Sequence, residues 1–219
     1  MLYLGDILPY SGVLFEGLWV SVKLTIVAVL AGSLFAIFIY SLKASRYRLL
    51  RGIATGYINV IRNTPLLLQL YLIYFALPSI GINLEALVAG AIALVLNNAA
   101  YVAEIYRAGF ESLPRGISEA GYALGMSSRQ VFKDIRLIPA LRNVLPSYTN
   151  QVILVFLASS IASIISVPEL THIMMEINSK TFRTIEIFIV GGVLYLVVAY
   201  AISLLSGWIE NHAIKWKVL

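Results

Sequence analysis

Residues 107–146, RAGFESLPRGISEAGYALGMSSRQVFKDIRLIPALRNVLP, form a polar stretch between two apolar segments that are each long enough to cross a membrane. This stretch holds six of the 16 Lys and Arg residues of the chain, namely Arg107, Arg115, Arg129, Lys133, Arg136 and Arg142. A basic loop between two spans lies on the cytoplasmic side of a membrane. Crossing the bilayer requires no loop of this length, so we expect it to dock a soluble partner there.

The composition is that of an integral membrane protein. Sixty per cent of the 219 residues are hydrophobic, 12% are charged and the mean hydropathy is +0.87. A soluble domain is closer to half apolar, with about a quarter of its residues charged. The net charge of +5 comes from basic residues at the ends of apolar runs, so it indicates orientation in a bilayer and not nucleic-acid binding. The start, MLYLGDILPYSG, lacks a basic region, so we expect no cleaved signal peptide.

The apolar runs predict an all-α integral membrane protein with five transmembrane helices, built as a single domain over residues 1–219. Each span needs roughly 20 apolar residues. The expected spans cover about Leu14–Leu42, Gly56–Leu77, Leu84–Ile105, Ser147–Val167 and Ile187–Ile209.

The basic residues predict an orientation with the N-terminus outside and the C-terminus in the cytoplasm. With five spans, one side receives the basic residues of 107–146 together with Lys43, Arg46, Arg48, Arg51, Arg62, Lys215 and Lys217. Only Lys180 and Arg183 fall in loops on the other side. The side that is rich in Lys and Arg is the cytoplasmic one.

The chain shows no sign of catalytic chemistry of its own. It has no Gly-Lys pair and hence no phosphate-binding loop, no HExxH, no GxSxG and no cysteine. Its two histidines, His172 and His212, lie far apart, and a lone His near a membrane interface is usually solvated. We therefore expect a non-enzyme without a cofactor or metal site.

Within the polar stretch, Glu119-Ala120-Gly121 is followed after three residues by Gly125, and then by Ile135 and Leu137. This pattern resembles the EAA coupling loop of type I ABC importer permeases. Further motifs are similar to the polar amino-acid (histidine/glutamine/arginine-type) subfamily: Arg62-Asn63-Thr64-Pro65-Leu66, Ala100-Tyr101 with Glu104 and Arg107, and Val167-Pro168-Glu169-Leu170. The resemblance covers nearly the whole chain.

Several positions depart from that family pattern. Gly121 replaces an Ala of the motif, Ile117 replaces a Gln, and Pro139 stands one residue later than the family's proline. The Lys-Asp-Thr-Ser run that is common in the fourth span appears here as Phe156-Leu157-Ala158-Ser159-Ser160, so a charge pair is missing from the middle of the membrane. Such a chain fits either a half of a heterodimer, whose partner supplies missing groups, or an altered choice of substrate.

The resemblance implies a set of residues that couple the permease to an ATPase. They are Gly116, Ser118, Glu119, Ala120, Gly121, Gly125 and Met126. We expect a short helix that starts near Ser118, with Glu119 in its first turn, where an acid complements the positive helix end. Small residues would give a low face that a partner approaches closely. The alternative is a solvated loop that only obeys the charge rule for orientation.

Polar side chains inside the spans are candidates for a substrate path, because they are costly in lipid and usually face protein or water. The candidates are Asn97, Asn98, Tyr101, Glu104, Asn150, Gln151, Ser159, Ser160 and Ser163. Asn97, Tyr101 and Glu104 share one helix face. The alternative is that these groups only bond across helices. Glu104 would in that case pair with Arg107, and we interpret Arg62 as an anchor or ion-pair partner and not as a ligand.

We therefore expect a permease subunit of an ATP-driven importer for a polar amino acid in the bacterial cytoplasmic membrane. Its expected partners are the lipid bilayer, a second permease half, two ATPase subunits that bind ATP and Mg, and an extracytoplasmic binding protein, with no nucleic acid. One alternative is an ABC permease for another small solute, such as an opine or a small peptide. Another is an ATP-independent secondary transporter or channel, although we find no internal repeat. A membrane enzyme is disfavoured by the missing catalytic motifs.

Overall fold

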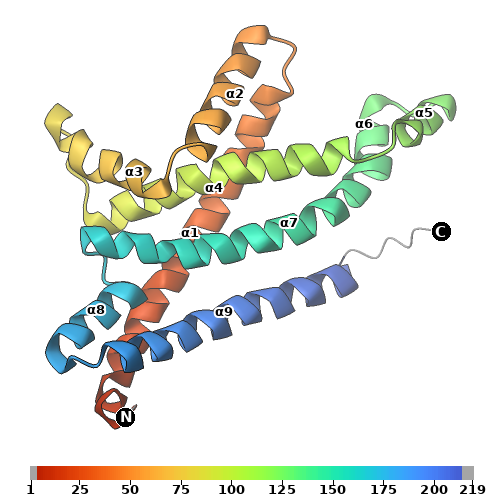
Figure 1. The fold of residues 1–219 in the computed structure, drawn as a ribbon. Coiled ribbons are helices and arrows are strands. Elements are labelled where there is room, and N and C mark those ends of the chain that lie inside the picture. The colour runs from red at the N-terminus through yellow and green to blue at the C-terminus, as the bar shows by residue number, and fades with distance from the viewer. Residues whose placement is uncertain (1–3, 214–219) are drawn as a thin grey trace.

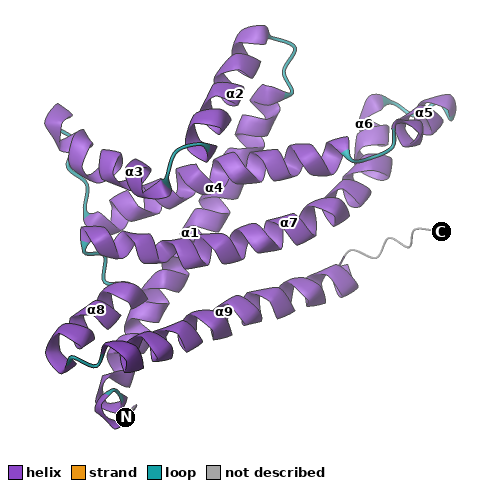
Figure 2. Ribbon diagram, in the orientation of Figure 1, coloured by secondary structure: helices purple, strands orange, loops and turns teal. Residues whose placement is uncertain are grey.

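The computed structural model describes residues 4–213 and is helical along almost all of that range, with no strand in it (Figure 2). The α-helices are α1 Ser11–Lys43, α2 Arg48–Arg62, α3 Leu66–Tyr71, α4 Ala86–Glu111, α5 Arg115–Ala123, α6 Ser128–Gln130, α7 Leu137–Ala158, α8 Leu170–Thr181 and α9 Thr184–Ala213. Short 3-10 helices cover Leu4–Asp6, Leu8–Tyr10, Leu77–Ile80 and Ser159–Ile165, and π-helical turns cover Leu72–Ala76 and Val131–Arg136.

Within residues 4–213, four helical stretches are long and apolar enough to cross a membrane: Leu8–Lys43, Ala86–Glu111, Ser128–Ile165 and Thr184–Glu210. The pair Arg48–Arg62 and Leu66–Ile80 makes a fifth if the two bent halves count as one span. The prediction of an all-α membrane protein is therefore confirmed, and the expected five spans are reached if the bent pair counts as one span. Lys215 and Lys217, which the orientation argument uses, lie outside the described residues.

The long helices α4 and α7 pack on each other, α9 packs on α7, and α1 crosses the layer and packs most extensively on α4 (Figure 1). α5 and α6 lie beyond one end of α4 and α7 (Figure 1). The N-terminal residues and α8 lie at the opposite end, and α9 returns from there toward the end that carries α5 and α6 (Figure 1). The polar connection between α4 and α7 is thus set apart from the bundle.

The expected second span, Gly56–Leu77, is not one helix. It is broken at residues 63–65, and α2 meets the helix that follows at 105°. Pro65 lacks an N–H donor, and its ring disfavours the helical conformation of the residue before it. Pro65 accordingly has extended geometry at ψ 137° and starts α3.

The expected loop over residues 107–146 is also largely helical. α4 runs on to Glu111, and a second helical stretch already begins at Ser128, so the fourth span starts 19 residues before the expected Ser147. Pro139 is tolerated because it stands in the first turn of α7, directly after the π-helical turn, where the regular bonding to the residue four before it is already interrupted. Polarity alone therefore overestimated the length of the loop.

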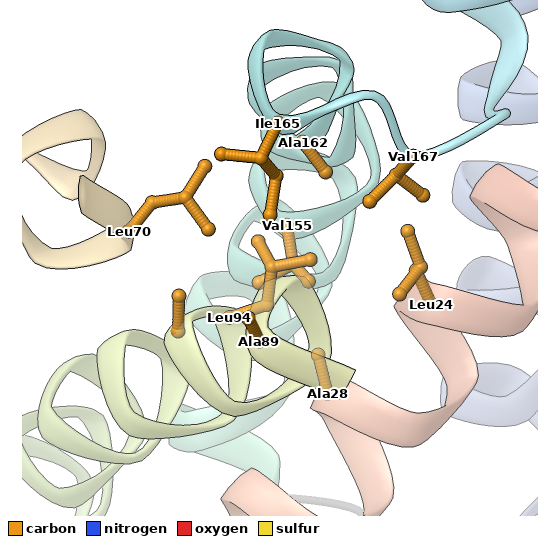
Figure 3. Close-up of a cluster of buried hydrophobic side chains, with 10 residues drawn as sticks. Leu24, Ala28, Leu70, Ala89, Leu94, Val155, Ala162, Ile165 and Val167 are labelled. Atoms are coloured by element: carbon orange, nitrogen blue, oxygen red, sulfur yellow. The ribbon is translucent and has the colours of Figure 1, made fainter. Parts of the chain in front are cut away.

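Three clusters of buried apolar side chains hold the bundle. One joins α1, α4 and the 3-10 segment after α7, with Leu24, Leu94 and Ile165 among its members (Figure 3). Leu70 from α3 points into the same cluster, so the broken span is anchored on the bundle (Figure 3). Small residues permit the close packing. A Cβ at Gly32 of α1 would lie 3.0 Å from the Val95 carbonyl oxygen of α4.

Candidate functional site

A cavity of about 540 Å³, lined by both polar and apolar side chains, lies where the break between α2 and α3 meets α4 and α7. It lies near the middle of α4, since Leu94, Asn97 and Tyr101 face it. The lining residues are Arg62, Asn63, Thr64, Pro65, Leu66, Leu94, Asn97, Tyr101, Gln151, Leu154, Val155, Ala158 and Ile161. Three of the nine path candidates, Asn97, Tyr101 and Gln151, are thus brought together at one cavity.

The break itself supplies part of the cavity wall, and a buried amide holds it. The Gln69 side chain donates from Nε2 to the Ile61 carbonyl at 2.8 Å and to the Thr64 carbonyl at 3.1 Å. These carbonyls stand near the end of α2, where helical partners run out. Irregular backbone at membrane depth persists only where its polar groups are bonded or face a cavity. Gln69 therefore permits the bend that brings Arg62 to the cavity.

The amides of Asn97, Asn98 and Gln151 have different roles. Asn97 donates to Gln69 Oε1 at 3.1 Å and faces the cavity. Asn98 is buried, donates to the Ala28 carbonyl of α1 at 3.0 Å and accepts a bond from Gln151 at 3.3 Å. Asn98 therefore ties α1 to α4 and α7, which is the interhelical role, and it does not line the cavity.

Glu104 lies at the centre of a charge cluster and not on the cavity wall. It accepts bonds from Lys43 of α1 and, at 2.8 Å, from Arg107, as the alternative interpretation of Glu104 expected. Arg62 lies 3.9 Å from Glu104, and its guanidinium stands 5.2 Å from the centre of the Tyr101 ring. From the sequence we interpreted Arg62 as an anchor or ion-pair partner and not as a ligand. The structure places it both on the cavity wall and next to this charge cluster.

The remaining path candidates do not line the cavity. Ser159, Ser160 and Ser163 each donate a 2.7 Å bond to the carbonyl three residues earlier in their own helix. Asn150 is exposed on α7 and is not among the lining residues. Ala158, which belongs to the uncharged run of residues 156–160, does line the cavity. Asn63 and Thr64 were missed, and their only signal was the run Arg-Asn-Thr-Pro.

The second site is the exposed hairpin of α5 and α6 between α4 and α7. α5 ends in a Schellman motif, in which Met126 N–H donates to the Gly121 carbonyl at 3.1 Å and Gly125 N–H to the Tyr122 carbonyl at 3.0 Å. Gly125 has φ +76°, a left-handed conformation that favours glycine. The next helix starts at once, because Ser127 and Gln130 form a reciprocal capping box.

The coupling candidates occupy both faces of this hairpin. Gly116, Glu119, Ala120 and Gly125 are exposed, whereas Ser118 and Met126 are half-buried. Gly121 is buried against the π-helical turn, where an added Cβ would lie 2.8 Å from the Ile135 side chain. The replacement of the motif's Ala by Gly121 therefore allows the close packing of α5 against the Ile135 side chain. Leu124 leaves 81% of its surface exposed at the tip, so the hairpin presents an apolar residue to a partner.

The helix start expected near Ser118 was wrong. α5 begins at Arg115, because Pro114 before it combines a proline φ of −56° with an extended ψ of 136°. Glu119 is therefore in the second turn, where the helix end is too distant to favour its charge strongly. Its side chain is exposed on the hairpin.

A helical membrane bundle with a cavity that polar side chains help to line, together with a separate exposed hairpin, is typical of a membrane transport subunit. The chain belongs to the family of binding-protein-dependent transport system inner membrane components, which matches residues 18–215. It is thus an integral membrane permease subunit of the type I ABC importer fold.

Known proteins are similar over nearly the full chain. It is 34% identical to the nopaline transport system permease protein NocM of Agrobacterium fabrum, over 88% of this chain and 86% of that protein. It is 32% identical to the arginine transport system permease protein ArtQ of Bacillus subtilis, over 93% and 94%. A crystal structure of an amino acid ABC transporter with histidines superposes with a TM-score of 0.91 at 36% identity, over 96% and 99%.

Proposed function

We propose that this chain is the membrane-spanning half of an ATP-driven importer that carries a polar amino acid across the bacterial cytoplasmic membrane. The observation that carries the proposal is the cavity of about 540 Å³, which combines a guanidinium with neutral amides and hydroxyls at mid-span. An amino acid needs donors for its carboxylate and acceptors for its ammonium, and these groups provide both. The similarity to transporters of several different amino acids supports an amino acid as the substrate.

The proposed assembly contains a second permease half, identical or similar, two ATPase subunits and an extracytoplasmic binding protein. Only 11% of the most apolar 18-residue segment of α9 is buried against the rest of the chain. Much apolar surface of α9 therefore remains for contact with lipid and with a second permease half. ATP and Mg belong to the ATPase subunits. Their closure moves the α5–α6 hairpins, and the two halves alternate between outward and inward openings.

The hairpin is the proposed contact with the ATPase. Arg115, Arg129 and Lys133 are exposed on or directly after the hairpin and favour an acidic partner surface, while the exposed Glu119 contributes an opposite charge. We expect Glu119→Lys to release the ATPase subunit or to uncouple ATP hydrolysis from uptake, with normal membrane insertion. Glu176→Lys, at an exposed position of α8 at the other end of the molecule, is the control. Normal co-purification and uptake in Glu119→Lys would remove Glu119 from the contact.

The test of the function is reconstitution of the intact complex in vesicles with its ATPase and binding protein. ATP-driven uptake of a labelled amino acid is the expected result, and it should stop without the ATPase subunit. Uptake that continues without that subunit would contradict the ATP-driven mechanism. An opine is the second candidate substrate, because relatives at 34% and 35% identity are named for nopaline and octopine. Uptake of an opine but of no amino acid would favour it.

A further inference from the structure

The charge of the cavity at the α2–α3 break is one-sided. Arg62 is its one charged lining residue among those that the structure describes, and no Asp or Glu of residues 4–213 lines it. Glu104 lies 3.9 Å from Arg62 but is already bonded by Lys43 and Arg107, and Arg107 also pairs with Glu111, so these two cations balance the two carboxylates and Arg62 is left in excess. The cavity therefore presents an excess positive charge.

The guanidinium of Arg62 is held in a defined place. It stands 5.2 Å from the centre of the Tyr101 ring, and Tyr101 Oη lies 3.5 Å from the Arg62 carbonyl oxygen. A guanidinium that stacks on an aromatic ring keeps its edge N–H groups free for a carboxylate, which it binds with two parallel bonds. The side chain is 41% exposed, so a ligand in the cavity has access to it.

The acceptors in the cavity are neutral. Asn97 and Gln151 each donate an amide N–H to a neighbour, to Gln69 Oε1 and to Asn98 Oδ1 respectively. These bonds orient both amides and leave their carbonyl oxygens as the remaining acceptors. Two such oxygens suit the single ammonium of an amino acid. They offer no ionised partner to a second cation.

Building on the proposed function, we propose that this cavity selects amino acids with neutral or acidic side chains and rejects those with cationic side chains, and that Arg62 binds the substrate α-carboxylate. A side-chain guanidinium or ammonium would lose its water here without gaining a carboxylate. It would also share the cavity with the like charge of Arg62. A neutral amide side chain meets donors and acceptors, and an acidic one meets the positive potential.

The absence of cysteine from the chain permits a direct test in the intact complex with its partner subunits. Ala158→Cys places a thiol on the cavity wall, and Leu157→Cys places one on the neighbouring residue, which is exposed and does not line the cavity. We expect L-glutamine and L-glutamate to slow maleimide labelling of the first thiol and not of the second. L-arginine and L-lysine should need at least about tenfold higher concentrations for the same protection.

Arg62→Gln in the Ala158→Cys background should raise the protecting concentration of L-glutamine by about tenfold or more, because a bond to a charged group is lost. Arg51→Gln is the matched control, since it removes an exposed cation of the same helix, α2, that does not line the cavity. It should leave protection unchanged. Ala158→Asp, which leaves Arg62 intact, should shift ATP-driven uptake toward L-arginine.

Three results would overturn the inference. L-arginine could protect the thiol from maleimide as well as L-glutamine does, or L-glutamine could protect it at an unchanged concentration in the Arg62→Gln variant. The third is that no amino acid protects the thiol while uptake proceeds. ATP-driven uptake of any amino acid by the unmodified complex still supports the proposed function in each of these cases. The absence of such uptake would instead count against the proposed function itself.

Discussion

Gly125 shows how one residue sets the geometry of the hairpin. Its φ of +76° allows the turn that satisfies the last carbonyls of α5 and delivers the chain to the Ser127 cap. The space around it is open, so a side chain would meet no neighbour, and the constraint is one of backbone conformation alone. The glycine at this motif position is thus explained by the backbone conformation of the turn.

The first prediction concerns this turn. Gly125→Ala should destabilise it by roughly 1–2 kcal/mol, which is the cost of a left-handed conformation for a residue with a Cβ. Amide exchange at Met126 should become about 5–30 times faster if the turn opens locally. Gly52→Ala is the control, because Gly52 lies in α2 with open space and ordinary helical φ. Equal exchange in the Gly125 variant and the unmodified chain would show that the turn is not strained by a Cβ.

Glu169 is a fully buried carboxyl outside the spans that ties three helices together. It caps α8 by accepting a bond from His172 N–H at 2.9 Å and accepts further bonds from Ser21 of α1 and Tyr195 of α9. Burial raises its pKa from an ordinary value of 4.5, because these bonds only partly offset the loss of water.

The second prediction follows from the sign of that shift. The folded state holds the Glu169 proton more tightly than the unfolded chain, so stability falls as pH rises from the ordinary carboxyl pKa through the raised one. Glu169→Gln should flatten this fall in a thermal unfolding series of the purified complex from pH 4.5 to 8. Exposed Glu176, whose pKa is lowered first by its bond with Lys180, behaves oppositely, so Glu176→Gln should not flatten it. An unchanged pH profile in Glu169→Gln would contradict the assignment.

At the scale of elements, the broken span creates the cavity. A straight helix over Gly56–Leu77 would keep Arg62, Asn63 and Thr64 within one helix, whereas the 105° bend turns them toward α4 and α7. The bend requires Pro65 to interrupt the helix and Gln69 to bond the carbonyls that are released. The side chain of Gln69 thus stabilises the irregular backbone of the broken span to which it belongs.

The third prediction tests that arrangement. Gln69→Leu leaves the Ile61 and Thr64 carbonyls without their side-chain donor, at a cost of about 1–3 kcal/mol for each group that stays unsatisfied. The yield and melting temperature of the complex should fall, and Asn97 should lose its orientation. Asn59→Leu, an exposed change on α2, is the control for added hydrophobicity. A Gln69 variant with normal yield and stability would show that other groups satisfy the break.

At the scale of the whole molecule, the bent pair decides the topology. If it crosses the membrane, the chain has five spans and its two ends lie on opposite sides, whereas four spans would place both ends on one side. The structure puts α8 at the end opposite the α5–α6 hairpin, and α9 returns toward the hairpin (Figure 1). Which end faces the cytoplasm follows only from the distribution of basic residues.

The fourth prediction is therefore a topology. A reporter after Leu219 should be cytoplasmic, and a reporter near Asn178 in α8 should be extracytoplasmic. A single cysteine at Leu8, exposed near the N-terminus, should be labelled from outside if the bent pair crosses the membrane. Labelling of that cysteine from the cytoplasm, together with the two expected reporter results, would show four crossings. Reversed labelling at all three places would reverse the orientation.

The sequence alone determined the membrane class, the approximate positions of the spans and the hairpin motif, since these depend on local composition and spacing. It also grouped Asn97 with Tyr101, because residues four apart share a helix face. It could not separate Asn97 from Asn98 in role, and it did not place Arg62 at the cavity. Those facts depend on which neighbour each side chain meets.

Only the tertiary structure decided which polar groups face the cavity. Helices such as α1 and α9 are apolar on all sides, so their patterns do not mark a protein-facing side, and packing against neighbours makes the choice. The sequence made Ser159, Ser160 and Ser163 candidates for the substrate path. In the structure they lie in a 3-10 helix, and each hydroxyl donates to the backbone carbonyl three residues earlier. Arg62 and Gln151 are far apart in sequence and line the same cavity because the chain bends between α2 and α3 at Pro65.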